Sequence, residues 1–150
     1  MQYQFESLSV TRNNIKELIN SLTLAQLNTK PSGFNNTIAW QLGHILVTQQ
    51  LLCYAFSNQK MLVTDTIIEK YRKGSIATLV TQEELDEILV LLAKTTAALE
   101  KDYTAKLFKT YSSYETSYGI KLNTIEESIQ MNNVHEGIHF GNMLALKKLV

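Results

Sequence analysis

A near absence of helix-breaking residues is the feature that most constrains the fold of this chain. Its 150 residues include one proline and six glycines, too few for the many tight turns of a β-sandwich or barrel. Hydrophobic residues make up 45% of the chain and charged residues 19%, which is typical of a packed globular protein rather than a disordered segment. We therefore expect a single all-α domain over residues 1–150.

Apolar residues at helical spacing predict four main helices, over about residues 4–21, 36–57, 81–103 and from 123 nearly to the C-terminus. Arg12 is the one polar step in the apolar stripe of the first helix. Capping-box patterns predict that a short helix begins at Thr23 and that the third main helix begins at Thr81. Residues 58–80 form a long connection between helices 2 and 3, with a short helix over about 67–72. The expected architecture is an antiparallel four-helix bundle.

Charge and cysteine content exclude several classes of protein. Fourteen Lys and Arg balance fourteen Asp and Glu, so the chain lacks the positive charge that nucleic-acid binders use. The single cysteine, Cys53, excludes an internal disulfide framework and a cysteine-based zinc site. No apolar run reaches the roughly 18 residues that span a bilayer, and the N-terminus lacks the pattern of a signal peptide. We expect a cytoplasmic protein with neither a nucleic-acid nor a membrane partner.

The three histidines, His44, His135 and His139, are the most informative residues about function. His135 and His139 are four residues apart, so both project from one face of the fourth helix. His44 lies in the middle of the second helix, and if the two helices are neighbours, all three imidazoles can converge. Three neutral histidines with an open fourth position are the ligand set of a catalytic zinc site. Nickel suits the same ligands, with iron, cobalt and manganese as further alternatives.

The surroundings of these histidines are expected to be polar. The face of the fourth helix that carries His135 and His139, the histidine stripe, is predicted to include Ser128, Asn132 and Asn142. Polar groups there need partners, which a metal ion and its bound water can supply. The connection over residues 104–122, which holds several tyrosines, is long enough to act as a lid over the metal. In the alternative interpretation, the three histidines never meet and are ordinary core or surface residues of a structural bundle.

Residues 135–139 read His-Glu-Gly-Ile-His and match the H-E-x-x-H pattern of zinc metalloproteases. Such enzymes take a third ligand downstream, yet residues 140–150 contain no His, Asp, Glu or Cys. The chain also shows no persuasive strand that could hold an extended peptide, so the context speaks against a protease. Glu136 could reach a metal-bound water, but we favour a role in orienting a neighbouring group or as a solvated charge.

Two segments carry a resemblance to a known family. Residues 31–45 contain Trp40, Gly43 and His44 in a Trp-x-x-Gly-His arrangement near the start of the second helix. Residues 135–142 contain the later His-x-x-x-His pair. Together with the order of the helices, these segments resemble the DinB-like superfamily, also described as YfiT-like metal-dependent hydrolases, over essentially the whole chain. Asn142 departs from the pattern, because glutamine is more usual at that position.

The resemblance implies a four-helix bundle that binds one divalent metal ion through His44, His135 and His139, often as a homodimer. Characterised relatives include thiol transferases and isomerases that use low-molecular-weight thiols such as bacillithiol or mycothiol. We therefore expect a metal-dependent hydrolase or thiol transferase that acts on a small molecule. A non-catalytic metal- or ligand-binding bundle is the alternative.

Overall fold

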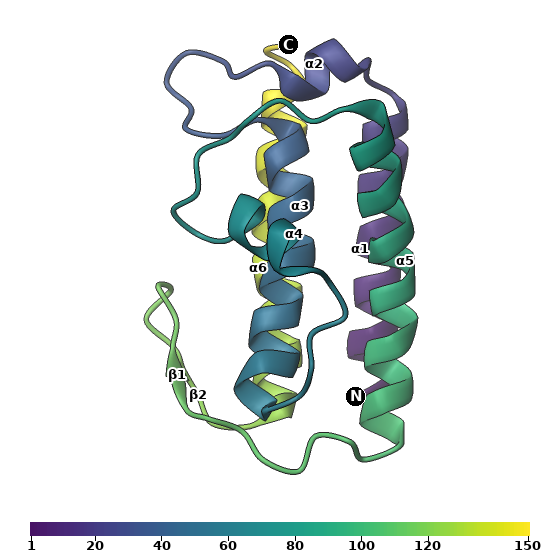
Figure 1. Ribbon diagram of the computed structural model, residues 1–150, viewed down its shortest axis with the longest axis vertical. Coiled ribbons are helices and arrows are strands. Elements are labelled where there is room, and N and C mark those ends of the chain that lie inside the picture. The colour runs from purple at the N-terminus through teal and green to yellow at the C-terminus, as the bar shows by residue number, and fades with distance from the viewer.

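Four helices dominate the structure, a computed structural model that describes residues 1–150 (Figure 1). They are α1 (Gln2–Asn20), α3 (Ile38–Gln49), α5 (Gln82–Thr104) and α6 (Ile125–Leu146), and the short helices α2 (Leu24–Asn28) and α4 (Asp65–Tyr71) lie in the connections. Helices make up 64% of the chain, which confirms the expectation of a mostly helical protein. None of them combines the length and the apolar composition that a membrane span requires.

A threonine hydroxyl caps the start of every α-helix except α1. In each case the hydroxyl accepts a hydrogen bond from the backbone N–H three residues later, one of the donors that a helix start leaves unpaired. The capping residues are Thr23, Thr37, Thr64, Thr81 and Thr124. At Thr23 the backbone N–H also donates to Gln26 Oε1 and completes the predicted capping box. The predicted starts near residues 23, 36, 81 and 123 are therefore confirmed, whereas α4 begins two residues before the predicted start at about 67.

The four main helices contact one another in a closed ring. α1 packs against α5 and α6, and α3 packs against the same two helices. As drawn in Figure 1, the chain runs upward in α1 and α6 and downward in α3 and α5, because the connection between α3 and α5 returns along the length of the molecule. The neighbours α1–α5 and α3–α6 are thus antiparallel, as expected. The neighbours α1–α6 and α3–α5 run in the same direction, which the sequence does not indicate.

A layer of buried polar side chains divides the apolar core into two clusters. On α1, Arg12 lies between Leu8, which belongs to one cluster, and Ile15, which belongs to the other. The layer draws on all four main helices and comprises Arg12, Gln49, Thr95, Asn132 and Glu136. Buried polar groups need hydrogen-bond partners, so this layer constrains how the four helices align with one another.

The second predicted helix changes its hydrogen-bonding pattern before it ends. α3 is followed by a π-helical segment, η1 (Gln50–Tyr54), and a 3-10 turn, η2 (Ala55–Ser57). The change falls at Gln49 and Gln50, which are fully buried. Gln50 Oε1 accepts a hydrogen bond from the Leu62 N–H at 2.7 Å, and its Nε2 donates to Gln49. The helical segment ends where predicted, at Ser57, but after Gln49 it continues as a wider π-helical turn and then a tighter 3-10 turn.

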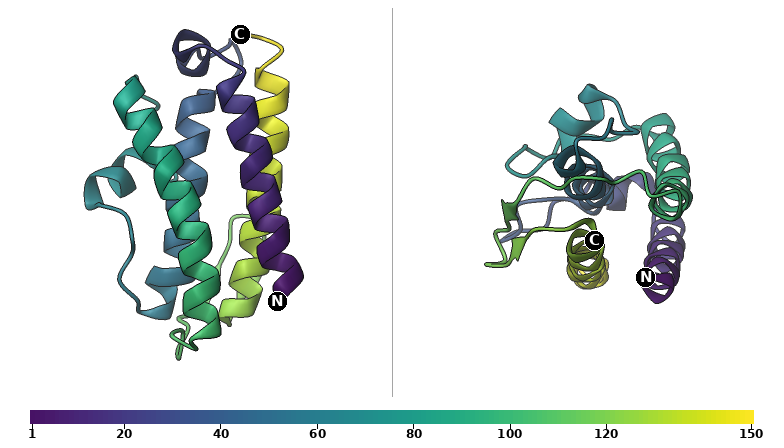
Figure 2. Two further views of the ribbon diagram at one scale, coloured as in Figure 1. Left: turned by 90° about the vertical axis from the view of Figure 1, so that its right-hand side faces the viewer. Right: turned by 90° about the horizontal axis from the view of Figure 1, so that it is seen from below.

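A small β-hairpin occupies the connection between α5 and α6, where the sequence predicts no regular structure. Its strands β1 (Tyr114–Glu115) and β2 (Lys121–Leu122) pair antiparallel. Strands of two residues are too short to show an alternating pattern. Tyr114 stacks on Phe56 of η2 with ring centroids 4.4 Å apart. Figures 1 and 2 show the hairpin on the side of the molecule formed by α3 and α6, away from α1.

Gly43 should be essential for the packing of α4 against α3. A β-carbon at this position would overlap the ring of Tyr71, which is fully buried. We expect Gly43→Ala to lower the free energy of unfolding by about 2–3 kcal/mol, as overpacked core sites do. Urea denaturation measures this loss.

Gly137→Ala is the matched control, because a β-carbon at Gly137 on the exposed side of α6 would contact nothing. The higher helix propensity of alanine should raise stability there by about 0.5–1 kcal/mol. Equal stability of Gly43→Ala and the wild type would contradict the close approach of Tyr71.

Candidate metal centre

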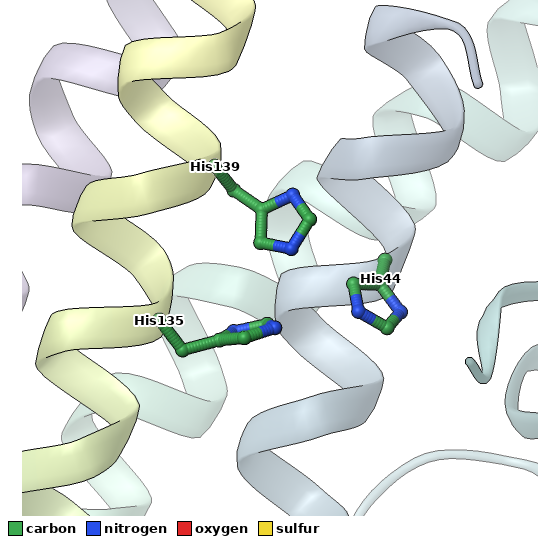
Figure 3. A group of neighbouring side chains, drawn as sticks. All are labelled: His44, His135 and His139. Carbon is green, nitrogen blue, oxygen red and sulfur yellow. The ribbon is translucent and has the colours of Figure 1, made fainter. Parts of the chain in front are cut away.

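Three imidazoles from two helices meet inside the molecule. His44 lies near the middle of α3, and His135 and His139 lie one turn apart on the facing side of α6 (Figure 3). The ring centroids are 4.5 to 5.2 Å apart. One ring nitrogen from each histidine lies within 4.8 Å of those of the other two. The predicted convergence of the three histidines is therefore confirmed, and their binding of a metal stays a prediction.

The neighbours of His44 fix the plane of its ring and its tautomer. Trp40, one turn earlier on α3, stacks on the imidazole with ring centroids 4.6 Å apart. Gly43 lets Tyr71 approach, and the Tyr71 carbonyl accepts a hydrogen bond from His44 Nδ1 at 2.7 Å. A carbonyl only accepts, so Nδ1 carries the proton and Nε2 keeps its lone pair. Within the Trp-x-x-Gly-His segment, Trp40 and Gly43 thus help to orient the ring of His44.

The two histidines of α6 differ in their partners. His139 Nδ1 lies 3.0 Å from Gln41 Oε1 of α3, an acceptor that leaves Nε2 of this ring available to a metal. His135 Nδ1 is buried and has no hydrogen-bond partner within the protein. A buried polar nitrogen without a partner is costly. One ring nitrogen from each of the three histidines is thus available to a divalent ion.

Burial keeps all three imidazoles neutral. Desolvation lowers the pKa of His135 to about 3, and the adjacent imidazoles of His139 and His44 lower it further. The pKa of His139 falls to about 4, again mainly through burial. The pKa of His44 is also lowered by burial, although its hydrogen bond to Tyr71 opposes the change. Neutral imidazole is the form that binds metals, so at neutral pH no proton has to be displaced.

Glu136 points into the core, so the expectation of a solvated charge is wrong. Its carboxylate is fully buried and accepts hydrogen bonds from Arg12 Nη2 at 2.7 Å and from Arg12 Nε at 3.0 Å. Asn132 Nδ2 donates a further bond at 2.9 Å. Arg12 Nη1 in turn donates to the Thr95 hydroxyl of α5. A carboxylate held in this way does not serve as a base beside the histidines.

The polar residues assigned to the histidine stripe also lie elsewhere. Ser128 donates to the Leu52 carbonyl at 2.7 Å, Asn132 binds Glu136, and Asn142 is exposed. Successive helical residues turn by about 100°, so the row 128-132-136 faces α1 and the core, while the row 131-135-139 faces α3. These polar residues therefore lie one row away from the imidazoles and do not surround them as predicted. Arg12 is the sequence feature that could have indicated a buried carboxylate, since a charge in an apolar stripe requires a buried partner.

A cavity of about 400 Å³ opens on the three imidazoles, and we call it the histidine cavity. Its apolar walls come from η1, η2 and α6 and comprise Leu51, Leu52, Phe56, Met131 and Ile138. The hairpin region supplies Tyr114, Thr116, Ser117 and Tyr118. The volume lies within the range of small-molecule sites. Part of the connection predicted as a lid therefore does border the candidate metal centre.

Comparison with known proteins identifies the family and the fold of this chain. A model of the DinB superfamily matches residues 7–143. The chain belongs to the DinB superfamily. The crystal structure of a conserved protein from Enterococcus faecalis shares the fold, with a TM-score of 0.67 and 15% sequence identity, over 99% of this chain and 95% of that one. No curated protein matches this DinB-superfamily chain.

Removing one partner of the buried ion pair should be strongly destabilising. We expect Arg12→Met to lower the free energy of unfolding by about 3–5 kcal/mol, because it leaves the Glu136 carboxylate buried without its cation. Replacing both residues with Met should recover much of that loss. Urea denaturation of the two single variants and the double variant measures the coupling.

Arg72→Met is the control, because its ion pair with Glu69 is exposed. Its stability should change by less than about 0.5 kcal/mol. Similar losses for Arg12→Met and Arg72→Met would contradict a stabilising role for the buried pair.

Proposed function

We propose that this protein is a metal-dependent enzyme whose divalent ion is held by His44, His135 and His139. The observation that carries the proposal is the meeting of three neutral imidazoles at one cavity. Three nitrogen ligands leave a coordination position for water or substrate. Membership of the DinB superfamily, whose proteins are metal-binding, supports the same assignment. Nitrogen ligation suits zinc or nickel first, with iron, cobalt and manganese as alternatives.

The lining of the histidine cavity favours thiol transfer over hydrolysis. When bound, a divalent ion supplies Lewis acidity that brings the pKa of a coordinated water or thiol toward neutrality. Attack by water is usually assisted by a general base, and no carboxylate lines the cavity. A thiol becomes a strong nucleophile once it is deprotonated and needs no further base. We therefore infer transfer of a low-molecular-weight thiol, of the bacillithiol or mycothiol kind, with hydrolysis as the second candidate.

The residues of the chain have separate tasks in this proposal. The Tyr71 carbonyl and the Gln41 side chain hold the Nδ1 protons of His44 and His139, so that the opposite nitrogens are presented. The apolar walls exclude water from the reacting sulfur. In the transfer, sulfur forms a bond to an electrophilic carbon, the leaving group departs with its electron pair, and the thiol proton passes to solvent.

The wider setting of the enzyme is also proposed. We interpret the ring of four contacting helices as a four-helix bundle. We place the protein in the cytoplasm, where low-molecular-weight thiols are kept reduced, and assign it a small-molecule substrate and no nucleic-acid partner.

The purified protein should contain about one divalent ion per chain, measured by inductively coupled plasma mass spectrometry. His44→Ala and His135→Ala should each lose most of it, because both remove a ligand. Asn142→Ala, an exposed change on α6, should retain the ion. Circular dichroism shows whether each variant keeps its helices. Full metal content in folded His44→Ala and His135→Ala would contradict the site.

The metal-loaded protein should accelerate the reaction of bacillithiol or mycothiol with 1-chloro-2,4-dinitrobenzene, and a chelator should abolish the acceleration. A panel of chromogenic esters tests the hydrolase alternative in parallel. One ion per chain without turnover in either assay would instead identify a non-catalytic metal-binding protein.

We also propose that the protein forms a homodimer through the exposed side of α6. Val134 is 43% exposed, and Gly141, two turns later on the same face of the helix, leaves open space. Light scattering should give about 34 kDa, twice the 17.0 kDa of one chain. Val134→Glu should shift the mass toward one chain, because a charge in a desolvated interface is unfavourable. A wild-type mass of 17 kDa would overturn the proposal.

A further inference from the structure

The histidine cavity carries one charged side chain, Lys73. The remaining lining residues are apolar, carry hydroxyl groups or are the three histidines, and none is a carboxylate. Lys73 therefore supplies the only permanent charge among the lining residues.

Lys73 differs from the other basic residues at the end of α4 in having no partner. Lys70 forms an ion pair with Glu84 at 2.7 Å, and Arg72 forms one with Glu69 at 2.9 Å. Lys73 forms neither an ion pair nor a side-chain hydrogen bond, and it is an exposed residue of the cavity lining. An unpaired cation beside apolar walls attracts a negative group more strongly than a neutralised one.

Contacts with α3 hold the turn that carries Lys73. Gly74 adopts a φ of 87°, a left-handed conformation that glycine allows without strain. Ser75 Oγ donates to a backbone carbonyl of α4 at 2.7 Å and accepts from Trp40 Nε1 at 2.9 Å. Trp40 in turn stacks on His44. The base of the Lys73 side chain is thereby held at a fixed place relative to the imidazoles.

We propose that the histidine cavity binds a small organic anion whose charged group pairs with Lys73. The apolar body of this molecule lies along Leu51, Met131 and Ile138, and its uncharged end lies toward the imidazoles. Lys73 is then a specificity-determining residue that selects organic acids over uncharged molecules of the same shape. This inference deepens the proposed function and rests on it for the reaction at the imidazole end. Binding of the anion does not depend on the proposed function.

Two probes with the same body, 3-phenylpropionate and 3-phenylpropanamide, test the proposal by isothermal titration calorimetry. The wild type should bind the acid about five- to tenfold more tightly than the amide. Lys73→Met keeps the apolar stem and should remove this preference, whereas Lys73→Arg should retain it. Lys94→Met removes an exposed lysine of α5 outside the cavity and should behave as the wild type.

Each titration is run on the protein as purified and after chelation, with the metal content measured in both. Loss of the preference in Lys73→Met and its retention in Lys73→Arg, in the chelated protein, supports the proposal even where the thiol and ester assays fail. A preference that persists in Lys73→Met places the anion at the imidazoles or at a metal and overturns the proposal. Equal binding of acid and amide by the wild type also overturns it.

Discussion

One buried ion pair determines how α6 faces the rest of the molecule. Arg12 and Glu136 are 124 positions apart in the chain, and their side chains are 5% and 0% exposed. Either charge alone would be strongly destabilising in this interior, so α6 takes the rotation that brings Glu136 to α1. The same rotation turns His135 and His139 toward α3. The candidate metal centre therefore depends on an interaction made by the neighbouring row of side chains on the same helix.

A different set of contacts orients the histidine of α3. Trp40 stacks on His44, and Gly43 admits Tyr71, whose carbonyl binds the ring at Nδ1. Trp40 lies one turn before His44 on the same helix, and Tyr71 belongs to the short helix α4. The site is thus assembled from a local motif on α3 and a long-range constraint on α6. Both parts lie on helices, which hold ligands more precisely than loops do.

The parts of the structure that could be predicted from the sequence are those that depend on local patterns. Helix starts at Thr23, Thr81 and Thr124 require only residues within one turn, and the inward placement of His44 and His135 follows from apolar spacing on each helix. The burial of Glu136 depends on Arg12 of another helix, so no pattern around residue 136 reveals it. The π-helical turn after Gln49 and the hairpin depend on distant contacts in the same way. Sequence spacing indicates which residues face inward, whereas the pairing of those residues between helices requires the structure.

The histidine cavity has walls of two kinds. The imidazoles stand on helices that are locked by buried contacts, while the outer wall belongs to a hairpin of two-residue strands whose aromatic anchor is Tyr114 on Phe56. Substitutions or insertions in that ribbon would leave the helical frame intact. In the proposed enzyme, changes to the hairpin would therefore alter which molecules fit the cavity while the three imidazoles stay in place.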